Sequence, residues 1–301
     1  MIKTKNIMIE SKHLSLNGEI FPITTSVISR YNKGFLYGEC FSFEIRGCNS
    51  QLFFPEISFN YLLKKAADFN FMMPDYYSQK IFEHSIFLLL RKNRIFKGFV
   101  GIISVFKSEN EEIQILITVE HCNKELYDLN KEGCLISLVK NPKIPNLFLE
   151  TTKFPFLNLN FYFENFINSQ DRYSDFILLD NDENIVRTIN SCIFFIKNDV
   201  LYYSPRNIDD INNYLNSFLL SFFEKLGFSV EQKNIKSSEI KQSNFDEILL
   251  FDVKNGFRWV MGYENDTEIT RYYNKIIRLL SNEINLYLKQ KINYEDRKNE
   301  V

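Results

Sequence analysis

The chain has 301 residues, of which 45% are apolar, so it can bury a substantial core in one large domain or two ordinary ones. Its 36 basic and 38 acidic residues leave a net charge of −2, which gives no electrostatic footprint for nucleic acid or an anionic membrane. The five scattered cysteines and three separated histidines indicate neither a disulfide framework nor a metal site. No apolar run is long enough for a signal peptide or a membrane span, and we expect a cytoplasmic protein with reduced thiols.

The first half of the chain reads as two strand hairpins, followed by helices and two further strands. Residues 7–30 alternate loosely between apolar and polar positions, and the run "NGEIFP" predicts the turn of the first hairpin. The run "FSFEIRGCNSQLFF" predicts the second, with Cys48-Asn49-Ser50 at its turn. This half is α+β, and we expect it to end near residue 128.

Two helices are predicted between these hairpins and the later strands. Helical spacing begins near Pro55, a residue typical of the first turn of a helix. In the next helix, over residues 76–93, Ile81, Ser85 and Leu88 are predicted to share one face. Two strands follow, over residues 98–108 and 112–122.

The second half alternates strands with helices. Asn198-Asp199 marks the turn of a clear hairpin. Residues 209–227 predict a single long helix that Gly227 ends. The remaining elements are expected as a strand at 133–141, a helix at 160–171, a strand with a turn at 173–186, a buried strand at 245–253 and a C-terminal helix at about 267–292.

Four segments, in order along the chain, carry a resemblance to a known family. They are "KGFLYGECFSFEIR", "TTKFPFLNLN", "RYSDFILLDNDENIVRTINSCIFFIKNDVLYYSP" and "FDEILLFDVKNGFRWV". Over residues 8–290 they resemble the class IV aminotransferases, which include the branched-chain and D-amino-acid aminotransferases and aminodeoxychorismate lyase. These proteins are pyridoxal-phosphate (PLP) enzymes of fold type IV.

The resemblance implies an α+β fold of the D-amino-acid aminotransferase type, in which PLP lies in a cleft between two domains. A small N-terminal α/β domain is expected over residues 1–128, and a larger, β-barrel-like α/β domain over residues 129–301. Members of the family are usually homodimers, which is the assembly that the resemblance implies here.

Lys153 falls in register with the lysine that holds PLP, and Asn160 lies at the family's spacing from it. The resemblance therefore implies that Lys153 forms the Schiff base and shuttles the proton. From the residues alone, Lys153 reads as an ordinary lysine with a buried stem and a surface amine.

At the other cofactor positions the sequence departs from the family. Tyr61 stands where the family has a phosphate-binding arginine, and Arg187 stands where a glutamate contacts the pyridine nitrogen. An arginine there can only donate, so it leaves the nitrogen unprotonated and the ring a poor electron sink. The phosphate-binding helix start becomes Asp210-Ile211-Asn212, preceded by Asp209, and the threonine-bearing loop becomes Val253-Lys254-Asn255.

Some of these residues also have a structural interpretation. Arg187 reads equally well as a solvated turn residue, and Asp209 and Asp210 read as caps of their helix. Two aspartates at that end would also repel the phosphate dianion of PLP.

Asn160 is also a candidate for lining a substrate cleft, together with three further residues. The first segment of the resemblance places Tyr37 and Arg46 there, and Arg46 is interpreted either as a structural salt bridge or as a contact to a substrate carboxylate. Arg258, together with Lys254, fits the binding of an acidic small molecule and fits plain surface charge as well.

Two functional hypotheses remain open. In the first, the PLP site is eroded: Lys153 is kept, its partners are replaced, and PLP binding is weak or lost. The chain is then a pseudoenzyme that acts as a homodimer or a heteromeric partner protein, or a cofactor-free enzyme. The alternative is an active PLP-dependent aminotransferase or lyase that acts on an amino acid or on aminodeoxychorismate through Lys153.

Overall fold

A computed structural model describes residues 11–139, 172–205, 210–241, 244–265 and 268–299. The chain divides into two compact units, one of Met1–Leu126 with Leu288–Val301 and one of Tyr127–Tyr287. The first unit is therefore built from two separate stretches of sequence, which the sequence did not predict. The predicted helix at 160–171 lies outside the described residues.

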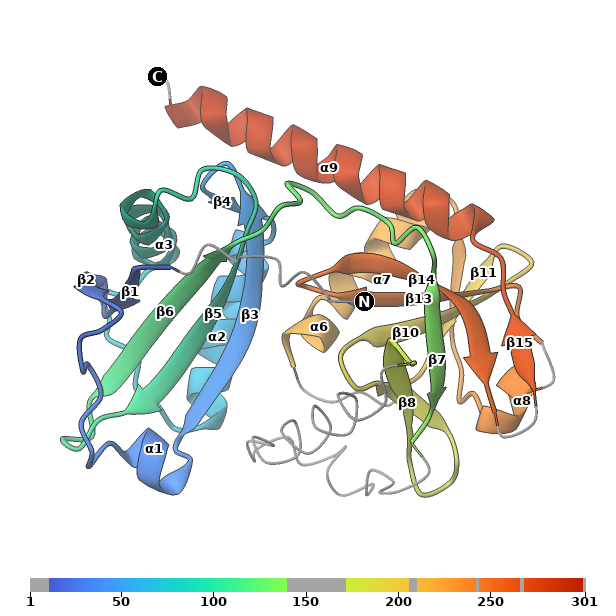
Figure 1. The fold of residues 1–301 in the computed structure, drawn as a ribbon, viewed down its shortest axis with the longest axis horizontal. Coiled ribbons are helices and arrows are strands. Elements are labelled where there is room, and N and C mark those ends of the chain that lie inside the picture. Colours follow the sequence, from blue (N-terminus) through green and yellow to red (C-terminus); the bar gives the residue numbers. More distant parts are fainter. Residues whose placement is uncertain (1–10, 140–171, 206–209, 242–243, 266–267, 300–301) are drawn as a thin grey trace, which may run out of the picture. The chain divides into compact units, whose positions relative to one another are not determined.

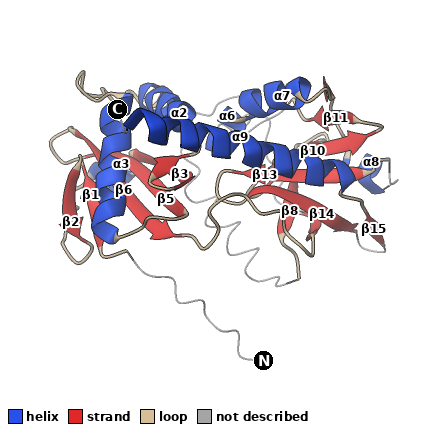
Figure 2. Cartoon of the chain, turned by 90° about the horizontal axis from the view of Figure 1, so that it is seen from above, coloured by secondary structure: helices blue, strands red, loops and turns tan. Residues whose placement is uncertain are grey.

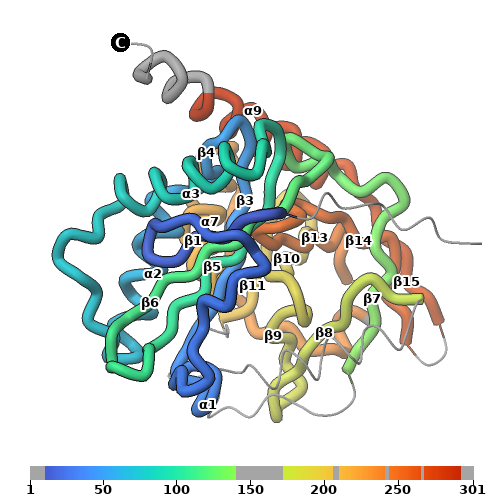
Figure 3. The backbone as a smooth tube through the Cα atoms, turned by 60° about the vertical axis from the view of Figure 1, so that its left-hand side comes forward, coloured from blue at the N-terminus to red at the C-terminus, as the bar shows by residue number. Residues whose placement is uncertain are grey.

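The first unit contains a six-stranded sheet with the strand order β2-β1-β6-β5-β3-β4. All its neighbouring strands pair antiparallel, and Figures 1 and 3 show β6, β5 and β3 side by side. The strands are β1 (His13–Leu16), β2 (Glu19–Pro22), β3 (Cys40–Cys48), β4 (Gln51–Leu52), β5 (Phe99–Lys107) and β6 (Ile113–His121).

Both predicted hairpin turns of this unit are confirmed. Asn17 and Gly18 connect β1 to β2, and Asn49 and Ser50 connect β3 to β4, all four with positive φ. Such turns match the right-handed twist of the paired strands, and asparagine and glycine adopt positive φ at little cost.

Three helices belong to the first unit: α1 (Lys33–Tyr37), α2 (Pro55–Asp68) and α3 (Gln79–Asn93). Helix α2 begins at Pro55, as predicted. Ile81, Ser85 and Leu88 share one face of α3, as the spacing predicts, but that face is not the buried one, because Ile81 and Leu88 are 39% and 37% exposed. The helix instead buries Phe82, Ser85, Ile86, Leu89 and Leu90. The apolar residues of α3 surround most of the helix, so spacing alone did not select the buried face.

The second unit contains a nine-stranded, curled sheet with the order β12-β11-β10-β13-β14-β7-β8-β9, and β15 pairs with β14 beside this path. The bounds of its strands are β7 (Cys134–Leu138), β8 (Asp175–Leu179), β9 (Ile185–Thr188), β10 (Cys192–Lys197), β11 (Val200–Tyr203), β12 (Ser229–Gln232), β13 (Glu247–Asp252), β14 (Gly256–Glu264) and β15 (Ile269–Arg271). The β10–β11 hairpin turns at Asn198 and Asp199, as predicted.

The core of the second unit surrounds its central strands. Every residue of β13 is buried, which is why "EILLFD" is an almost unbroken apolar run rather than an alternating one. Phe194 of β10 packs its ring edge-on against Phe223 at a centroid distance of 5.4 Å. On the other side of the sheet, Phe195 packs against Phe245 at 4.8 Å.

The helix predicted over 209–227 is interrupted in the structure. It forms α6 (Ile211–Tyr214) and α7 (Asn216–Lys225), with Leu215 between them. Gly227 follows the end of α7 with φ +89°, a conformation that glycine adopts readily. A short helix, α8 (Ser237–Lys241), precedes β13.

The C-terminal helix α9 (Lys275–Asn299) starts later than predicted, because residues 269–271 form strand β15 instead. The N–H groups of Ile276 and Ile277, in the first turn of α9, donate hydrogen bonds to the two carboxylate oxygens of Glu247. Figure 2 shows α9 beside α7, where Tyr287 contacts Phe218 at a ring-centroid distance of 5.4 Å.

Within the described part of the chain, no helix is long and apolar enough to cross a membrane. All five cysteines fall inside that part, and each is a free thiol.

Candidate functional site

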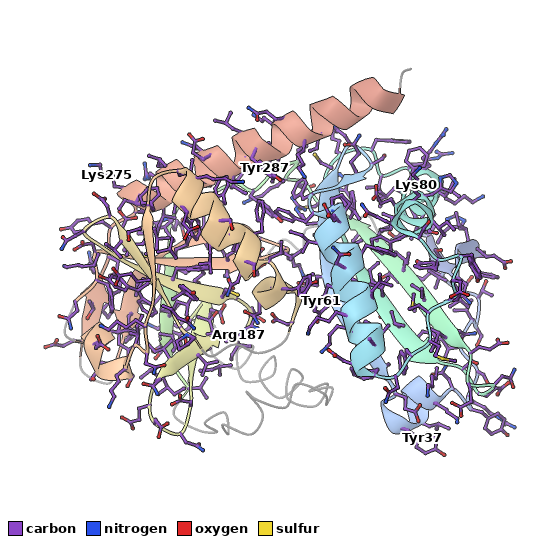
Figure 4. All side chains as sticks on the ribbon, turned by 180° about the vertical axis from the view of Figure 1, so that it is seen from behind. Tyr37, Tyr61, Lys80, Arg187, Lys275 and Tyr287 are labelled. Atoms are coloured by element: carbon purple, nitrogen blue, oxygen red, sulfur yellow. The ribbon has the colours of Figure 1, made fainter. Side chains whose placement is uncertain are left out.

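Arg187 lies on strand β9 and is only 4% exposed, so it is not a solvated turn residue (Figure 4). Its Nε donates to the main-chain oxygen of Thr188 at 2.8 Å, and its Nη1 donates to Oδ2 of Asp210. Burial by itself would lower the pKa of Arg187, but Asp210, Cys192 and Asp175 outweigh it and raise that pKa. The guanidinium is therefore a firmly charged, buried cation with one carboxylate in direct contact.

Asp210 is the residue that caps α6. Its Oδ1 accepts a hydrogen bond of 2.8 Å from the N–H of Asn213, while its Oδ2 takes the contact with Arg187. The prediction that Asp210 caps its helix is confirmed. The same carboxylate thus satisfies a helix N–H and neutralises a buried arginine, with one oxygen for each.

Asn212, on the first turn of α6, connects two loops of the sheet. Its Oδ1 accepts from the N–H of Val253 at 2.9 Å, and its Nδ2 donates to the main-chain oxygen of Asn190 at 3.4 Å. Since Asn212 is 8% exposed, these bonds satisfy groups that would otherwise be buried without partners. Side chains of α6 therefore reach β9, the turn before β10 and the β13–β14 turn.

A second polar network lies between β8, β13 and β14. Nη2 of Arg258 lies 3.2 Å from Oδ2 of Asp175 and 3.3 Å from Oδ2 of Asp252. The same nitrogen donates to Oγ of Ser191 at 2.6 Å, and Thr188 Oγ1 donates to Oδ2 of Asp175 at 3.0 Å. Arg258 has a side-chain exposure of 15% and two carboxylate partners, so it is not plain surface charge.

One guanidinium serves two carboxylates in this network, and the pKa values of Asp175 and Arg258 are both raised. Burial raises the pKa of the Asp175 carboxyl, although Arg258 and hydrogen bonds from Phe176 and Thr188 oppose the shift. Burial would lower the pKa of Arg258, but its neighbours, first among them Asp252, raise it. Asp175 is therefore the acid of this network that holds a proton more readily than an exposed aspartate.

Two buried thiols lie beside these arginines. Burial raises the pKa of Cys192 to about 12, against the opposing effect of Arg187. Burial also raises the pKa of Cys134, whose sulfur is 3.9 Å from Nη1 of Arg258. Neither thiol is activated, because a reactive cysteine needs a depressed pKa and access to solvent.

Three predicted site residues belong to the first unit. Tyr61 is 3% exposed and packs edge-on against Phe43, with ring centroids 5.1 Å apart. Arg46 is 3% exposed, and its guanidinium donates to the main-chain oxygens of Phe99 and Lys124. Tyr37, at the end of α1, is 72% exposed and projects away from the first sheet (Figure 4).

The other predicted site residues have the following positions. Ile211 is buried on α6, and Lys254 is exposed in the turn between β13 and β14. Lys153, Asn160 and Asp209 lie outside the described residues.

Sequence reasoning missed Asp175, Asp252 and Ser191 as members of a buried network. A usable signal was present, because Asp175 and Asp252 stand at the ends of the apolar runs "FILL" and "ILLF". A charged residue that directly borders a buried strand needs a partner of opposite charge.

The order of strands and helices defines the fold of the class IV aminotransferases, as the resemblance implied. Among solved structures of this fold, the chain is similar to the branched-chain aminotransferase from Thermoproteus uzoniensis with norvaline. The two share 14% identity at a TM-score of 0.73, over 93% of this chain and 94% of that one.

Two further solved structures have a similar fold. The branched-chain aminotransferase from Thermobaculum terrenum in its PLP form gives a TM-score of 0.74 at 14% identity, over 93% of this chain and 94% of that one. The Escherichia coli enzyme gives 0.71 at 14% identity, over 85% and 87%. The sequence matches no protein-family model and no curated relative.

Proposed function

We propose that this chain is a divergent protein of the class IV aminotransferase fold whose cofactor position is closed by its own side chains, so that it works without PLP. The observation that carries the proposal is the ion pair between Arg187 and Asp210. By the resemblance, it joins the residue expected in place of the pyridine partner to the residue expected at the phosphate end.

Arg187 would keep the pyridine nitrogen of PLP unprotonated, which weakens the electron sink but does not by itself exclude catalysis. An electron-sink ring needs an acid partner that keeps its nitrogen protonated, whereas a charged guanidinium can only donate. Arg187 is also already engaged by Asp210 and by the main-chain oxygen of Thr188.

The phosphate end does not fit the start of α6. By the resemblance, Asp210 stands at that position; its carboxylate already takes the N–H of Asn213, while Asn212 takes the N–H of Val253. A phosphate dianion about 5 Å from the carboxylate would meet a repulsion of about 1 to 3 kcal/mol for each pair of unit charges, at an effective dielectric of about 20 to 80.

On this proposal the chain is a pseudoenzyme or a cofactor-free protein that works through association in the cytoplasm. The expected assembly is a homodimer, or a heteromer with a related subunit. A small acidic or amino-acid ligand remains a candidate for a cofactor-free site.

The second candidate function is an active PLP-dependent aminotransferase or lyase. The register of Lys153 favours it, and the neighbours of similar fold are aminotransferases solved with PLP or norvaline. In that case an amino acid or aminodeoxychorismate is the substrate and Lys153 forms the Schiff base.

PLP titration with covalent trapping decides between the two. The purified protein is titrated with PLP, any imine is reduced with borohydride, and the modified lysine is located by mass spectrometry. We expect low, non-saturating labelling that is spread over exposed lysines and is the same in the Lys153→Ala variant.

A matched control is Lys275→Ala, which removes an exposed lysine at the start of α9, outside the predicted site positions. Saturable labelling that disappears only in Lys153→Ala, together with an imine absorbance band, would establish the PLP enzyme and overturn the proposal.

A further inference from the structure

The Arg187–Asp210 pair combines a buried cation with a partly accessible anion. The side chain of Arg187 is 5% exposed, while that of Asp210 is 31% exposed. Solvent therefore reaches the ion pair through Asp210. An external anion would have to approach Arg187 from the same side.

The two oxygens of Asp210 have separate roles. Oδ1 caps α6 through the N–H of Asn213, and Oδ2 accepts from Arg187. Charge and capping can therefore be separated by experiment, because asparagine is as good a helix cap as aspartate and carries no charge.

Arg187 has no other described carboxylate in direct contact. Asp175 acts on it only through the longer-range field, and it is bound to Thr188, Ser191 and Arg258 instead. A buried guanidinium that loses its only contacting carboxylate keeps its charge and gains a strong preference for another anion.

We infer that Arg187 is a receptor for a small oxyanion and that Asp210 is its internal occupant, which keeps external anions out. This inference rests on the proposed function, since it takes the site to be closed to PLP in the wild-type chain. A tethered carboxylate competes at an effective concentration of about a millimolar or more, so a weakly bound external anion cannot displace it.

The ligand class follows from the geometry. Asp210 offers one carboxylate oxygen to Nη1 of Arg187, so a carboxylate or phosphate group reproduces its contact. Acetate and inorganic phosphate serve as separate probes, which distinguish a carboxylate from a phosphate ligand.

The test compares Asp210→Asn with the wild-type chain by isothermal titration and by the shift of the thermal midpoint. Each probe is added at constant ionic strength against chloride. We expect Asp210→Asn to bind at least one of the two probes about tenfold or more tightly than the wild type. The double variant Asp210→Asn/Arg187→Gln is expected to lose that gain.

The inference is overturned if Asp210→Asn responds to both probes as the wild type does, or if its gain persists in the double variant. Should Asp210→Asn fail to fold in chloride, rescue of folding by acetate or phosphate supports the inference, and failure of both to rescue it overturns the inference. Asp210→Ser, which also retains a capping oxygen, repeats the comparison. Failure of the proposed function is detected separately, as PLP labelling of Lys153 in the wild-type chain.

Discussion

Nη2 of Arg258 lies 3.2 Å from Oδ2 of Asp175, although the two residues are 83 positions apart in the chain. The same nitrogen lies 3.3 Å from Oδ2 of Asp252, so a single cation is shared between two buried carboxylates. This arrangement makes the second unit sensitive to pH and to the loss of one side chain, and both effects can be measured.

The first prediction concerns the pH dependence of stability at Asp175. Burial raises the pKa of its carboxyl, so the folded chain binds this proton more tightly than the unfolded chain does. The stabilisation is fully present below the unfolded pKa, near 4, and is lost as the pH rises through the folded pKa. In urea denaturation, the stability of the wild type relative to Asp175→Asn should therefore fall as the pH rises from about 4 to 7.

Asp246→Asn supplies a control of opposite sign. A hydrogen bond from Lys197 lowers the pKa of Asp246, so its stabilisation is present above the unfolded pKa and is lost as the pH falls. Because Asp246 is 41% exposed, we expect a small effect. If the two variants gave parallel profiles of stability against pH, the raised pKa of the Asp175 carboxyl would be contradicted.

The second prediction concerns Arg258→Met. The change leaves Asp175 and Asp252 buried without their cation, which should lower the free energy of unfolding by about 3 to 5 kcal/mol. Arg172→Met is the matched control, since Arg172 is 60% exposed and pairs with Glu264 at 3.1 Å. Denaturant titration of Arg172→Met should show a loss of about 0 to 1 kcal/mol in the free energy of unfolding. If Arg258→Met lost no more than Arg172→Met, the buried network would not be stabilising.

The third prediction compares two glycines with similar backbone angles. Gly256 has φ +70° and Gly38 has φ +72°, so alanine is strained at both positions. A Cβ at Gly256 would lie 2.2 Å from Cγ of Tyr127, whereas a Cβ at Gly38 meets nothing within 4 Å. Gly38→Ala should cost about 1 to 2 kcal/mol, and Gly256→Ala about 3 kcal/mol or more.

Thermal unfolding of both alanine variants measures this difference. Tyr127 is 1% exposed and donates to the main-chain oxygen of Val253 at 2.7 Å, so its ring cannot move aside without losing that bond. Equal costs at the two glycines would mean that the close packing of Tyr127 on Gly256 is absent in solution.

The fourth prediction concerns thiol reactivity. Burial raises the pKa of Cys192 to about 12, and the residue is 4% exposed, so the native protein should not be alkylated there at pH 8. Cys40 and Cys122 are only partly buried and should be modified before Cys192. Timed iodoacetamide labelling with peptide mass spectrometry checks this order, and early labelling of Cys192 would contradict the closed position of the strand that carries it.

The local elements could be predicted from sequence wherever the turn chemistry is strong. Asn17-Gly18, Asn49-Ser50 and Asn198-Asp199 define three hairpins, because few residues accept positive φ at adjacent positions. The buried face of α3 and the first residue of α9 could not be predicted, since the neighbouring apolar residues in both places suit more than one periodicity. Tertiary pairing with β14 makes residues 269–271 a strand rather than a helical turn.

The candidate site shows the same division. The alignment with the family suggested that Arg187 and Asp210 occupy cofactor positions. It did not suggest that they bind each other, because the two residues are 23 positions apart and their contact depends on where α6 meets β9. The partners of Arg258 were equally hidden, since Asp175 reaches it across the parallel pairing of β7 with β8 and β14. Lys153 and Asn160 stay predictions, as they lie outside the described residues.

The capping of α9 by Glu247 has a consequence for how the protein is made. The helix starts on a strand of the second unit, and its residues from Leu288 onward belong to the first unit. During translation, the second unit therefore has all of its segments before the first unit does, even though the first unit begins earlier in the chain. The amino-terminal half emerges from the ribosome first, yet we expect the second unit to have its full set of segments earlier, which reverses the usual order of folding from the amino terminus.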